Sequence, residues 1–237
     1  MRFDKPMRRG TLIRRYKRFL TDVELDSGGM VTAACPNTGS MIGLTAPGRP
    51  VWLSVSDKPS RKYPHTWELL EHETQGLVGI NTGHPNRIVA EAIAAGRVPG
   101  LGVYAGLRQE VNYGRNSRID ILLEDPHRPP CYVEVKNVHL LREPGLAEFP
   151  DCVTERGKKH LVELSDMVRG GARAVMVYLI QCAAPQRFRL AHDLDPDYAR
   201  AFRAARQAGV EAMALTCHLS TEEIGVAEAI PVEDIHE

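Results

Sequence analysis

Four charged residues stand in two otherwise apolar segments near the middle of the chain. Residues 118–123 are RIDILL and residues 131–136 are CYVEVK. Aliphatic and β-branched residues of this kind form buried strands, where a charged group is costly. Side chains two residues apart in a strand share a face, so Glu134 and Lys136 point the same way. If the two strands pair, Asp120 can join them.

Two facing carboxylates with an ammonium group beside them are the parts of a divalent-metal site that cuts phosphodiesters. The carboxylates repel one another in a low dielectric unless a cation lies between them. We expect Asp120 and Glu134 to hold Mg²⁺ or Mn²⁺, with the backbone carbonyl of Val135 as a third oxygen ligand. Lys136 would orient the attacking water or stabilise the charge of the phosphorane. Glu91, on the flank of a preceding helix, is the expected outer ligand.

The same residues also have a purely structural interpretation. An E-x-K triplet is common on strands, so Asp120, Glu134 and Lys136 could form a plain cross-strand ion pair. Glu91 by itself could be a solvated helix residue, and Glu110 is expected at the surface or in an ion pair. The residue pattern alone leaves both interpretations open.

The elements that position these residues divide the chain into two domains. Five short strands with turn-forming clusters between them predict an OB-like β-barrel over residues 1–83. The first strand-sized segment is interpreted as one strand, with Phe19, Thr21 and Val23 facing inward. The five expected strands are 11–25, 30–35, 50–55, 65–73 and 76–81.

Helical and strand patterns alternate after Gly83, which predicts an α/β domain over residues 84–237. Asn86 is the expected N-cap of a first helix that Gly96 ends. The order α-β-β-β-α-β-α-β indicates a mixed sheet. Later helices are expected at 154–169 and 196–207, and strands at 107–113, 118–123, 131–140, 174–180 and 210–217.

The formal net charge is zero, but the two ends of the chain differ in charge. Residues 1–20 contain eight Lys or Arg and one Asp, whereas residues 218–237 contain six acidic residues and no Lys or Arg. The basic end predicts a local surface for a polyanion, unless both ends are solvated tails. Contacts to phosphates make binding salt-sensitive and weakly dependent on sequence. The expected DNA contacts are Arg14, Arg15, Lys17, Arg18, Arg61, Lys62, Arg156, Lys159 and His160.

Composition excludes other classes of protein. No apolar stretch follows the basic N-terminus, and the longest apolar run, residues 174–180, is too short to span a bilayer. The five cysteines form no C-x-x-C pair, so we expect reduced thiols and no zinc site. These features predict a soluble, cytoplasmic protein without a membrane partner.

The chain resembles the sugar fermentation stimulation protein A family of bacteria and archaea. The resemblance implies an OB-like N-terminal domain, a C-terminal domain similar to P-D-(D/E)-x-K restriction-endonuclease-like nucleases, and weakly sequence-specific DNA binding. It also implies a role in regulating sugar (maltose) metabolism. The stretches that carry it are RYKRFL (15–20), CPNTGSM (35–41), RKYPHTWEL (61–69), SRIDILL (117–123), CYVEVKNVHL (131–140) and FPDCVTERGKKHLVEL (149–164).

The resemblance places the nuclease motif on Asp120, Glu134 and Lys136, with Glu91 as the helix acid. Asn137 and His139 stand where the family usually has Ser and Thr. One hypothesis is therefore a DNA-binding protein with a Mg²⁺-dependent deoxyribonuclease site. The alternative is a non-enzymatic, DNA-binding regulator with an inactive nuclease fold. RNA as the substrate, and the oligomeric state, stay open.

Overall fold

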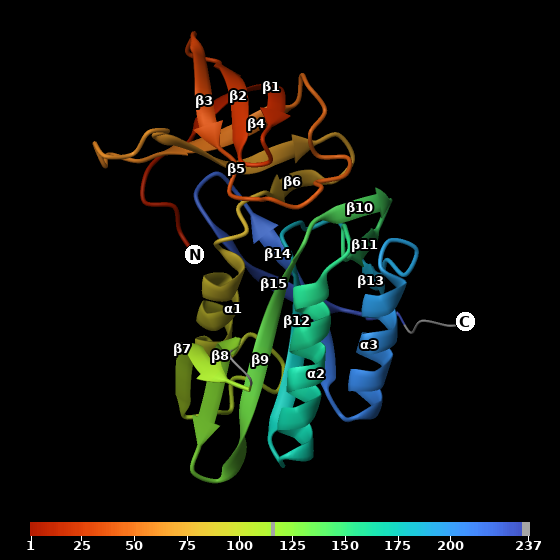
Figure 1. Ribbon diagram of the computed structural model, residues 1–237. Coiled ribbons are helices and arrows are strands. Elements are labelled where there is room, and N and C mark those ends of the chain that lie inside the picture. Colours follow the sequence, from red (N-terminus) through yellow and green to blue (C-terminus); the bar gives the residue numbers. More distant parts are fainter. Residues whose placement is uncertain (115–116, 234–237) are drawn as a thin grey trace.

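A barrel of short strands stands on one end of a larger sheet that is flanked by helices (Figure 1). The computed structural model describes residues 1–114 and 117–233. The first third of the chain forms the barrel and its additional strand. Its strands are β1 (Arg8–Tyr16), β2 (Leu20–Leu25), β3 (Met30–Ala34), β4 (Pro50–Val55), β5 (His65–His72) and β6 (Gly76–Gly79).

Five strands close the barrel, which confirms the predicted OB-like fold. They are hydrogen-bonded in the order β3-β2-β1-β4-β5, and a bridge between Ala34 and Thr66 joins β3 to β5 and completes the ring. The sixth strand, β6, pairs only with β5 in this sheet and lies outside the ring. The ring is therefore not made of the five segments expected from the sequence.

The segment 11–25 is a hairpin, not the single strand that was predicted. Lys17 and Arg18 have φ angles of 51° and 66°, and this left-handed backbone reverses the chain between β1 and β2. Turns of this hand are usually marked by Gly, Asn or Asp, so no sequence signal revealed this one. Thr21 and Val23 are buried as predicted, whereas the turn leaves Phe19 51% exposed.

The second domain is built on a six-stranded sheet with the order β15-β14-β12-β9-β8-β7. The sheet is mixed, as the sequence predicted, but its edge strand β15 was not predicted. Strand β12 is parallel to β9 and β14, and the other pairs are antiparallel. The strands are β7 (Gly106–Tyr113), β8 (Ser117–Asp125), β9 (Arg128–Val138), β12 (Arg173–Ile180), β14 (Glu211–Leu219) and β15 (Ile224–Ile230).

A three-stranded sheet, which was not predicted, lies at the end of this domain nearer the barrel (Figure 1). Its strands are β10 (Leu140–Glu143), β11 (Leu146–Phe149) and β13 (Arg187–Leu190). Each has four residues, which is too short for a period-two pattern to distinguish it from a loop.

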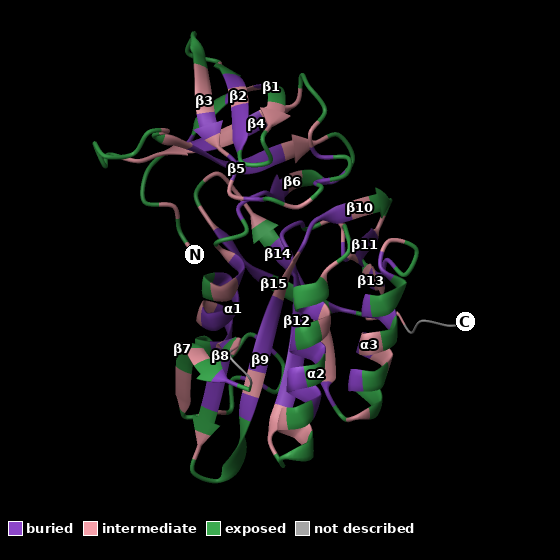
Figure 2. Ribbon diagram, in the orientation of Figure 1, coloured by how far each residue is buried: buried purple, intermediate pink, exposed green. Residues whose placement is uncertain are grey.

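Helices cover both faces of the mixed sheet (Figure 1). Ile88 and Val89 of α1 (Pro85–Ala94) pack with Ile121 and Val133 in one core cluster. The other cluster contains Leu161 of α2 (Glu155–Arg169), Tyr198 of α3 (Pro196–Gln207), Met176 and Tyr178. The sheet is buried along its centre and exposed at its ends (Figure 2). Among the described residues, no helix has the length and hydropathy needed to cross a bilayer.

The two domains are joined by more than the linker that was expected. The chain passes from β6 to α1 at residues 80–84, beside the boundary predicted at residue 83. Residues 1–3, by contrast, lie on the second domain, where the N–H of Phe3 donates to the carbonyl of Glu222 and the N–H of Ile224 donates to the carbonyl of Met1, both at 2.9 Å.

Candidate metal and nucleic-acid site

Asp120, Glu134 and Lys136 come together where β8 and β9 separate. The regular pairing of the two strands ends at Ile121 and Val133. Beyond that point, Asp120 Oδ2 accepts a hydrogen bond of 2.8 Å from the backbone N–H of Val135. Lys136 Nζ donates to Glu134 Oε1 at 2.7 Å. The spatial arrangement that the strand pattern predicted is therefore present.

The two carboxylates of this cluster have very different surroundings. Burial and the negative charge of Glu134 raise the pKa of Asp120 to about 6, against the effects of the Val135 N–H and Lys136. Burial also acts to raise the pKa of Glu134, but His160 and Lys136 outweigh it and the pKa is lowered. The side chain of Glu134 is only 2% exposed. Its Oε2 atom is buried without a hydrogen-bond partner among the described residues.

His160 of α2 holds Glu134 in place. Arg156 Nε donates to His160 Nε2 at 3.3 Å, and a guanidinium can only donate, so Nε2 carries no proton. Its Nδ1 faces Glu134 Oε1 and also lies 3.2 Å from Lys136 Nζ. The sequence predicted that His160 contacts DNA. Because both of its ring nitrogens already have partners in the protein, His160 organises the cluster instead of offering a free donor to DNA.

Glu91, the predicted outer ligand, is not part of this cluster. Its Oε1 accepts from Arg87 Nε at 2.8 Å, and its Oε2 lies 2.8 Å from the amino group of Met1. Five residues along a helix correspond to a rotation of about 140°, so Glu91 lies on a different face of α1 from Asn86. The expectation that Glu91 binds the metal does not agree with this placement.

Asn86 is the residue of α1 that reaches the cluster. The helix has His84 as its N-cap and Pro85 in its first turn, so Asn86 is not the predicted N-cap and its side chain is available for other contacts. Its Nδ2 donates to Asp120 Oδ1 at 2.8 Å and to Glu110 Oε1 at 3.1 Å. This amide therefore connects two carboxylates from neighbouring strands.

Glu110 lies opposite Asp120 at the one interruption of the β7–β8 ladder. Gln109 pairs with Ile121 and Val111 with Ile119, but Glu110 has a φ of 54°. Glu rarely adopts this conformation, so no sequence signal revealed it. Among the described residues, no three Asp, Glu, His or Cys side chains already stand in a metal-binding geometry. Asn86 lies between two of these carboxylates, and Glu134 is bound to Lys136.

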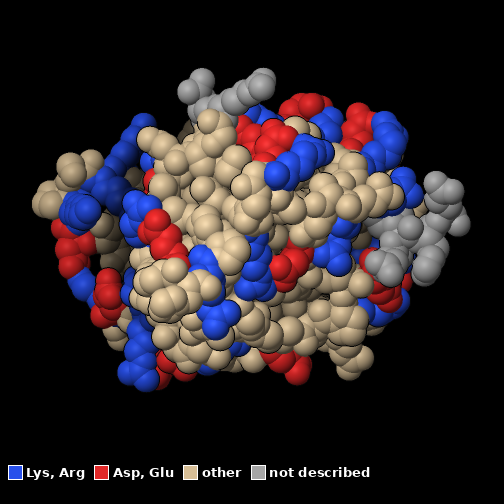
Figure 3. Space-filling view, turned by 90° about the horizontal axis from the view of Figure 1, so that it is seen from below, with Lys and Arg blue, Asp and Glu red and all other residues tan. Residues whose placement is uncertain are grey.

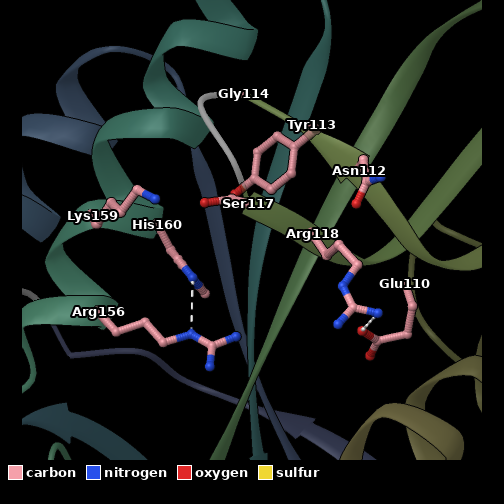
Figure 4. Close-up of a pocket in the computed structure, with 9 residues that line it drawn as sticks. All are labelled: Glu110, Asn112, Tyr113, Gly114, Ser117, Arg118, Arg156, Lys159 and His160. Carbon is pink, nitrogen blue, oxygen red and sulfur yellow. Dashed lines mark hydrogen bonds and ion pairs between the residues drawn. The ribbon is translucent and has the colours of Figure 1, made fainter.

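A cleft of about 750 Å³ opens beside the cluster, between the β7–β8 hairpin and α2 (Figure 4). Arg118, Arg156 and Lys159 give it positive charge, and Glu110 lies 3.9 Å from Arg118, the ion pair expected for it. A cationic cleft next to buried carboxylates suits a phosphodiester. The other lining residues are Asn112, Tyr113, Gly114, Ser117 and His160.

Many of the N-terminal cations are already paired with acidic residues, so they contribute less charge to the local polyanion-binding surface that was expected. At the end of the second domain farthest from the barrel, cationic and acidic side chains are also interspersed (Figure 3). The ion pairs are Arg2 with Glu223, Lys5 with Asp57, Arg9 with Glu71 and Asp26, and Arg14 with Asp22.

The remaining barrel cations differ in how available they are to a ligand. Lys17 and Arg18 are exposed in the β1–β2 turn. Arg61 donates to Thr66 Oγ1 at 2.8 Å, and Lys62 Nζ lies 5.5 Å from the centre of the Tyr63 ring. These four side chains keep at least part of their charge accessible and stay candidates for DNA contact.

Arg15 is a structural residue, contrary to its predicted contact with DNA. Its Nη2 donates to the backbone carbonyls of Arg18, Asn37 and Gly39 at 2.8 to 2.9 Å. We expect Arg15→Met to lower the free energy of unfolding by about 1–3 kcal/mol, because three carbonyls lose a charged donor. Urea denaturation measures this loss. If Arg15→Met instead weakened DNA binding at unchanged stability, the structural role would be wrong.

Comparisons with known proteins agree with this fold along the whole chain. The model of the SfsA N-terminal OB domain matches residues 13–80, and that of the sugar fermentation stimulation protein RE domain matches residues 83–223. The latter agrees with the restriction-endonuclease-like domain expected from the sequence.

Relatives of similar length and a solved structure extend the agreement. Sugar fermentation stimulation protein homologs of Brucella ovis and Brucella melitensis are 57% identical over 235 residues, covering 99% of this chain and 98% of theirs. The structure of Pyrococcus furiosus SfsA in complex with Ca²⁺ matches with a TM-score of 0.85 and 28% identity, covering 99% of this chain and 98% of that one. The chain belongs to the sugar fermentation stimulation protein family.

Proposed function

We propose that this protein binds DNA and hydrolyses its phosphodiester bonds with a divalent cation held by Asp120 and Glu134. The observation that supports this proposal is the Oε2 atom of Glu134, which is buried without a hydrogen-bond partner among the described residues. It belongs to the same cluster as Asp120, whose pKa is raised to about 6. A cation would give that oxygen a partner and relieve the repulsion between the carboxylates. Oxygen ligands are those that Mg²⁺ and Mn²⁺ prefer.

Each neighbouring side chain has a definite task in this proposal. A bound cation would activate water and offset charge on the phosphoryl group. His160 fixes the orientation of Glu134, and Asn86 and the Val135 N–H fix Asp120. Lys136, bound to Glu134 Oε1, supplies a positive charge for the phosphorane. The carbonyl of Val135 is the further oxygen ligand that we propose.

The relatives support the proposal in two respects. The Pyrococcus furiosus SfsA was solved in complex with Ca²⁺, so a divalent cation binds that relative. The name of the Brucella homologs refers to stimulation of sugar fermentation. A contribution of this protein to the regulation of sugar (maltose) metabolism is proposed on that name alone.

Incubation of the purified protein with plasmid and single-stranded DNA tests the catalytic part. We expect cleavage with Mg²⁺ or Mn²⁺, none with EDTA, and none by Glu134→Ala. Glu124→Ala is the matched control, because Glu124 is an exposed carboxylate on the same sheet, paired with Arg108 at 2.7 Å. Absence of cleavage by the wild type, or cleavage that survives in Glu134→Ala, contradicts the catalytic proposal. Competition with RNA then identifies the preferred nucleic acid.

The second candidate is a DNA-binding regulator that does not cut. Lys136 and His160 are already bound to Glu134 Oε1, and this favours a cluster that is stable without a metal. Such a protein binds DNA in the presence of Mg²⁺ and leaves a plasmid intact over hours. Direct observation of plasmid integrity separates the two candidates.

Cations that line the cleft are expected to control the salt dependence of binding. Arg156→Ala should weaken binding to any DNA sequence and lower the slope of log K against log salt concentration by about one. Lys158→Ala is the control on the same helix, because Lys158 pairs with Glu155 at 2.6 Å and Asp197 at 3.5 Å. Fluorescence anisotropy at several salt concentrations gives both slopes. Equal slopes for wild type and Arg156→Ala would remove Arg156 from the interface.

A further inference from the structure

The turn between β1 and β2 presents an aromatic ring to solvent directly after two cations. Phe19 is 51% exposed, and Lys17 and Arg18 precede it. Both cations have a left-handed backbone, with φ of 51° and 66°, where Gly or Asn would be less strained. The pairing of Tyr16 with Leu20 imposes this backbone, but it does not require an exposed aromatic ring or two cations at these positions.

The backbone of the turn is held by hydrogen bonds on both sides. Arg15 Nη2 donates to the carbonyl of Arg18 at 2.8 Å and also to the carbonyls of Asn37 and Gly39. The N–H of Cys35 donates to the carbonyl of Phe19 at 2.8 Å. Because the backbone is fixed on both sides, the Phe19 ring loses little freedom when a ligand covers it, which favours binding.

The turn also lies beside the second domain, near the cleft. Arg15 joins the carbonyls of Arg18 and Gly39, and the neighbouring Ser40 Oγ donates to the carbonyl of Asp151 at 2.7 Å, so the turn lies beside the segment that leads into α2. Val153, which is 63% exposed, is three residues before Arg156. Three residues of chain span at most about 10 Å, so the two residues lie no farther apart than that. Arg156 lines the cleft. A strand leaving the cleft therefore needs only a few nucleotides to reach the turn.

The chemistry of the turn fits an unpaired nucleotide. The turn has no acidic residue, and within the described residues neither Lys17 nor Arg18 has a carboxylate partner. Cations beside an exposed aromatic ring are how proteins bind single strands, through phosphates and through stacking on a base. A base inside a duplex is already stacked on both sides, so the ring has little to gain from paired DNA.

We propose that Lys17, Arg18 and Phe19 form a binding surface for an unpaired nucleotide of the strand that occupies the cleft. Phe19 stacks on the base, and the two cations contact the neighbouring phosphates. This inference rests on the proposed DNA binding and specifies its substrate class as DNA with a single-stranded segment. Phenylalanine has no hydrogen-bonding group, so the contact does not select among bases.

Anisotropy titrations without divalent cations test this surface apart from cleavage. The probes are a labelled single strand and the blunt duplex of the same sequence. We expect Phe19→Ala to weaken binding to the single strand about tenfold and to the duplex less than about twofold. Phe19→Trp should restore single-strand binding. Met30→Ala is the control, because Met30 is 60% exposed in the same barrel, and it should change neither affinity.

The outcomes separate this inference from the proposed function. If Phe19→Ala loses equal affinity for the single strand and the duplex, or loses none, the stacking surface is overturned. Metal-dependent cleavage by the wild type is measured independently of this result. A wild type that binds neither probe overturns both. A selective loss that Phe19→Trp reverses supports the surface, whether or not the protein cleaves DNA.

Discussion

Lys136→Met is expected to lower the rate of metal-dependent DNA cleavage about 10²–10³-fold at saturating metal, the cost of losing one preorganised electrostatic contact in a transition state. The Nζ of Lys136 is 2.7 Å from Glu134 Oε1, so it stands next to the proposed position of the reacting phosphate. Methionine keeps the length of the side chain and removes only its charge. Single-turnover cleavage of a labelled oligonucleotide measures the loss.

Cation affinity distinguishes this role from a purely structural one. Removal of a positive charge beside Glu134 should leave binding of Mn²⁺ unchanged or tighter, as measured by titration calorimetry. A structural role would weaken metal binding together with cleavage. Lys158→Met is the matched control on α2 and should change neither quantity. Cleavage by Lys136→Met within about threefold of wild type would rule out Lys136 as the stabilising cation.

Asp120→Asn is expected to make the metal-free protein more stable at pH 8, by about 2 kcal/mol, while it abolishes stabilisation by metal. The pKa of Asp120 is raised to about 6, from about 4 in an unfolded chain. Two pKa units correspond to roughly 3 kcal/mol, which the partial exposure of Asp120 reduces. Asparagine keeps one acceptor oxygen, which can accept from the Val135 N–H, whereas its NH2 group then faces the Nδ2 of Asn86 and reduces the gain. Urea denaturation in EDTA at pH 8 measures the gain.

The pH dependence follows from the sign of this shift. Between about pH 4 and pH 6 the folded protein binds more protons at Asp120 than the unfolded chain does. The stabilisation from this group is complete below pH 4 and is lost as the pH rises through 6. The difference in the free energy of unfolding between Asp120→Asn and the wild type should therefore shrink as the pH is lowered from 8 to 5. Affinity of the wild type for Mn²⁺ should fall over the same interval, because protonated Asp120 is a poor ligand.

A second buried carboxylate supplies a control of opposite sign. Arg142 and Arg189 outweigh burial and lower the pKa of Glu148. Glu148→Gln should therefore destabilise the protein at pH 8, since it removes the buried negative charge that faces Arg142 and Arg189. If Asp120→Asn destabilised the metal-free protein at pH 8 as Glu148→Gln does, the proposed repulsion between Asp120 and Glu134 would be wrong.

The sequence by itself determined the elements whose patterns are local. Helix α3 begins and ends at the predicted residues, 196 and 207, and Thr154, where the second helix was predicted to begin, caps α2. The strands that carry Asp120, Glu134 and Lys136 were identified because charges interrupt β-branched runs. The burial of one face of a helix or strand produces a hydrophobic period of a few residues. A single segment of sequence is therefore enough to predict the element.

Only the tertiary structure decided which side chains became partners. Asn86 reaches Asp120 across 34 residues, and Arg15 reaches the carbonyl of Gly39 across 24. Glu91 is the acidic residue of α1 and was the predicted ligand, but the orientation of the helix places Asn86, not Glu91, against Asp120. The left-handed backbone at Lys17 and Glu110 is imposed by strand register, which overrides the preference of each residue. Contacts between distant segments depend on how the elements pack, and no local pattern encodes that.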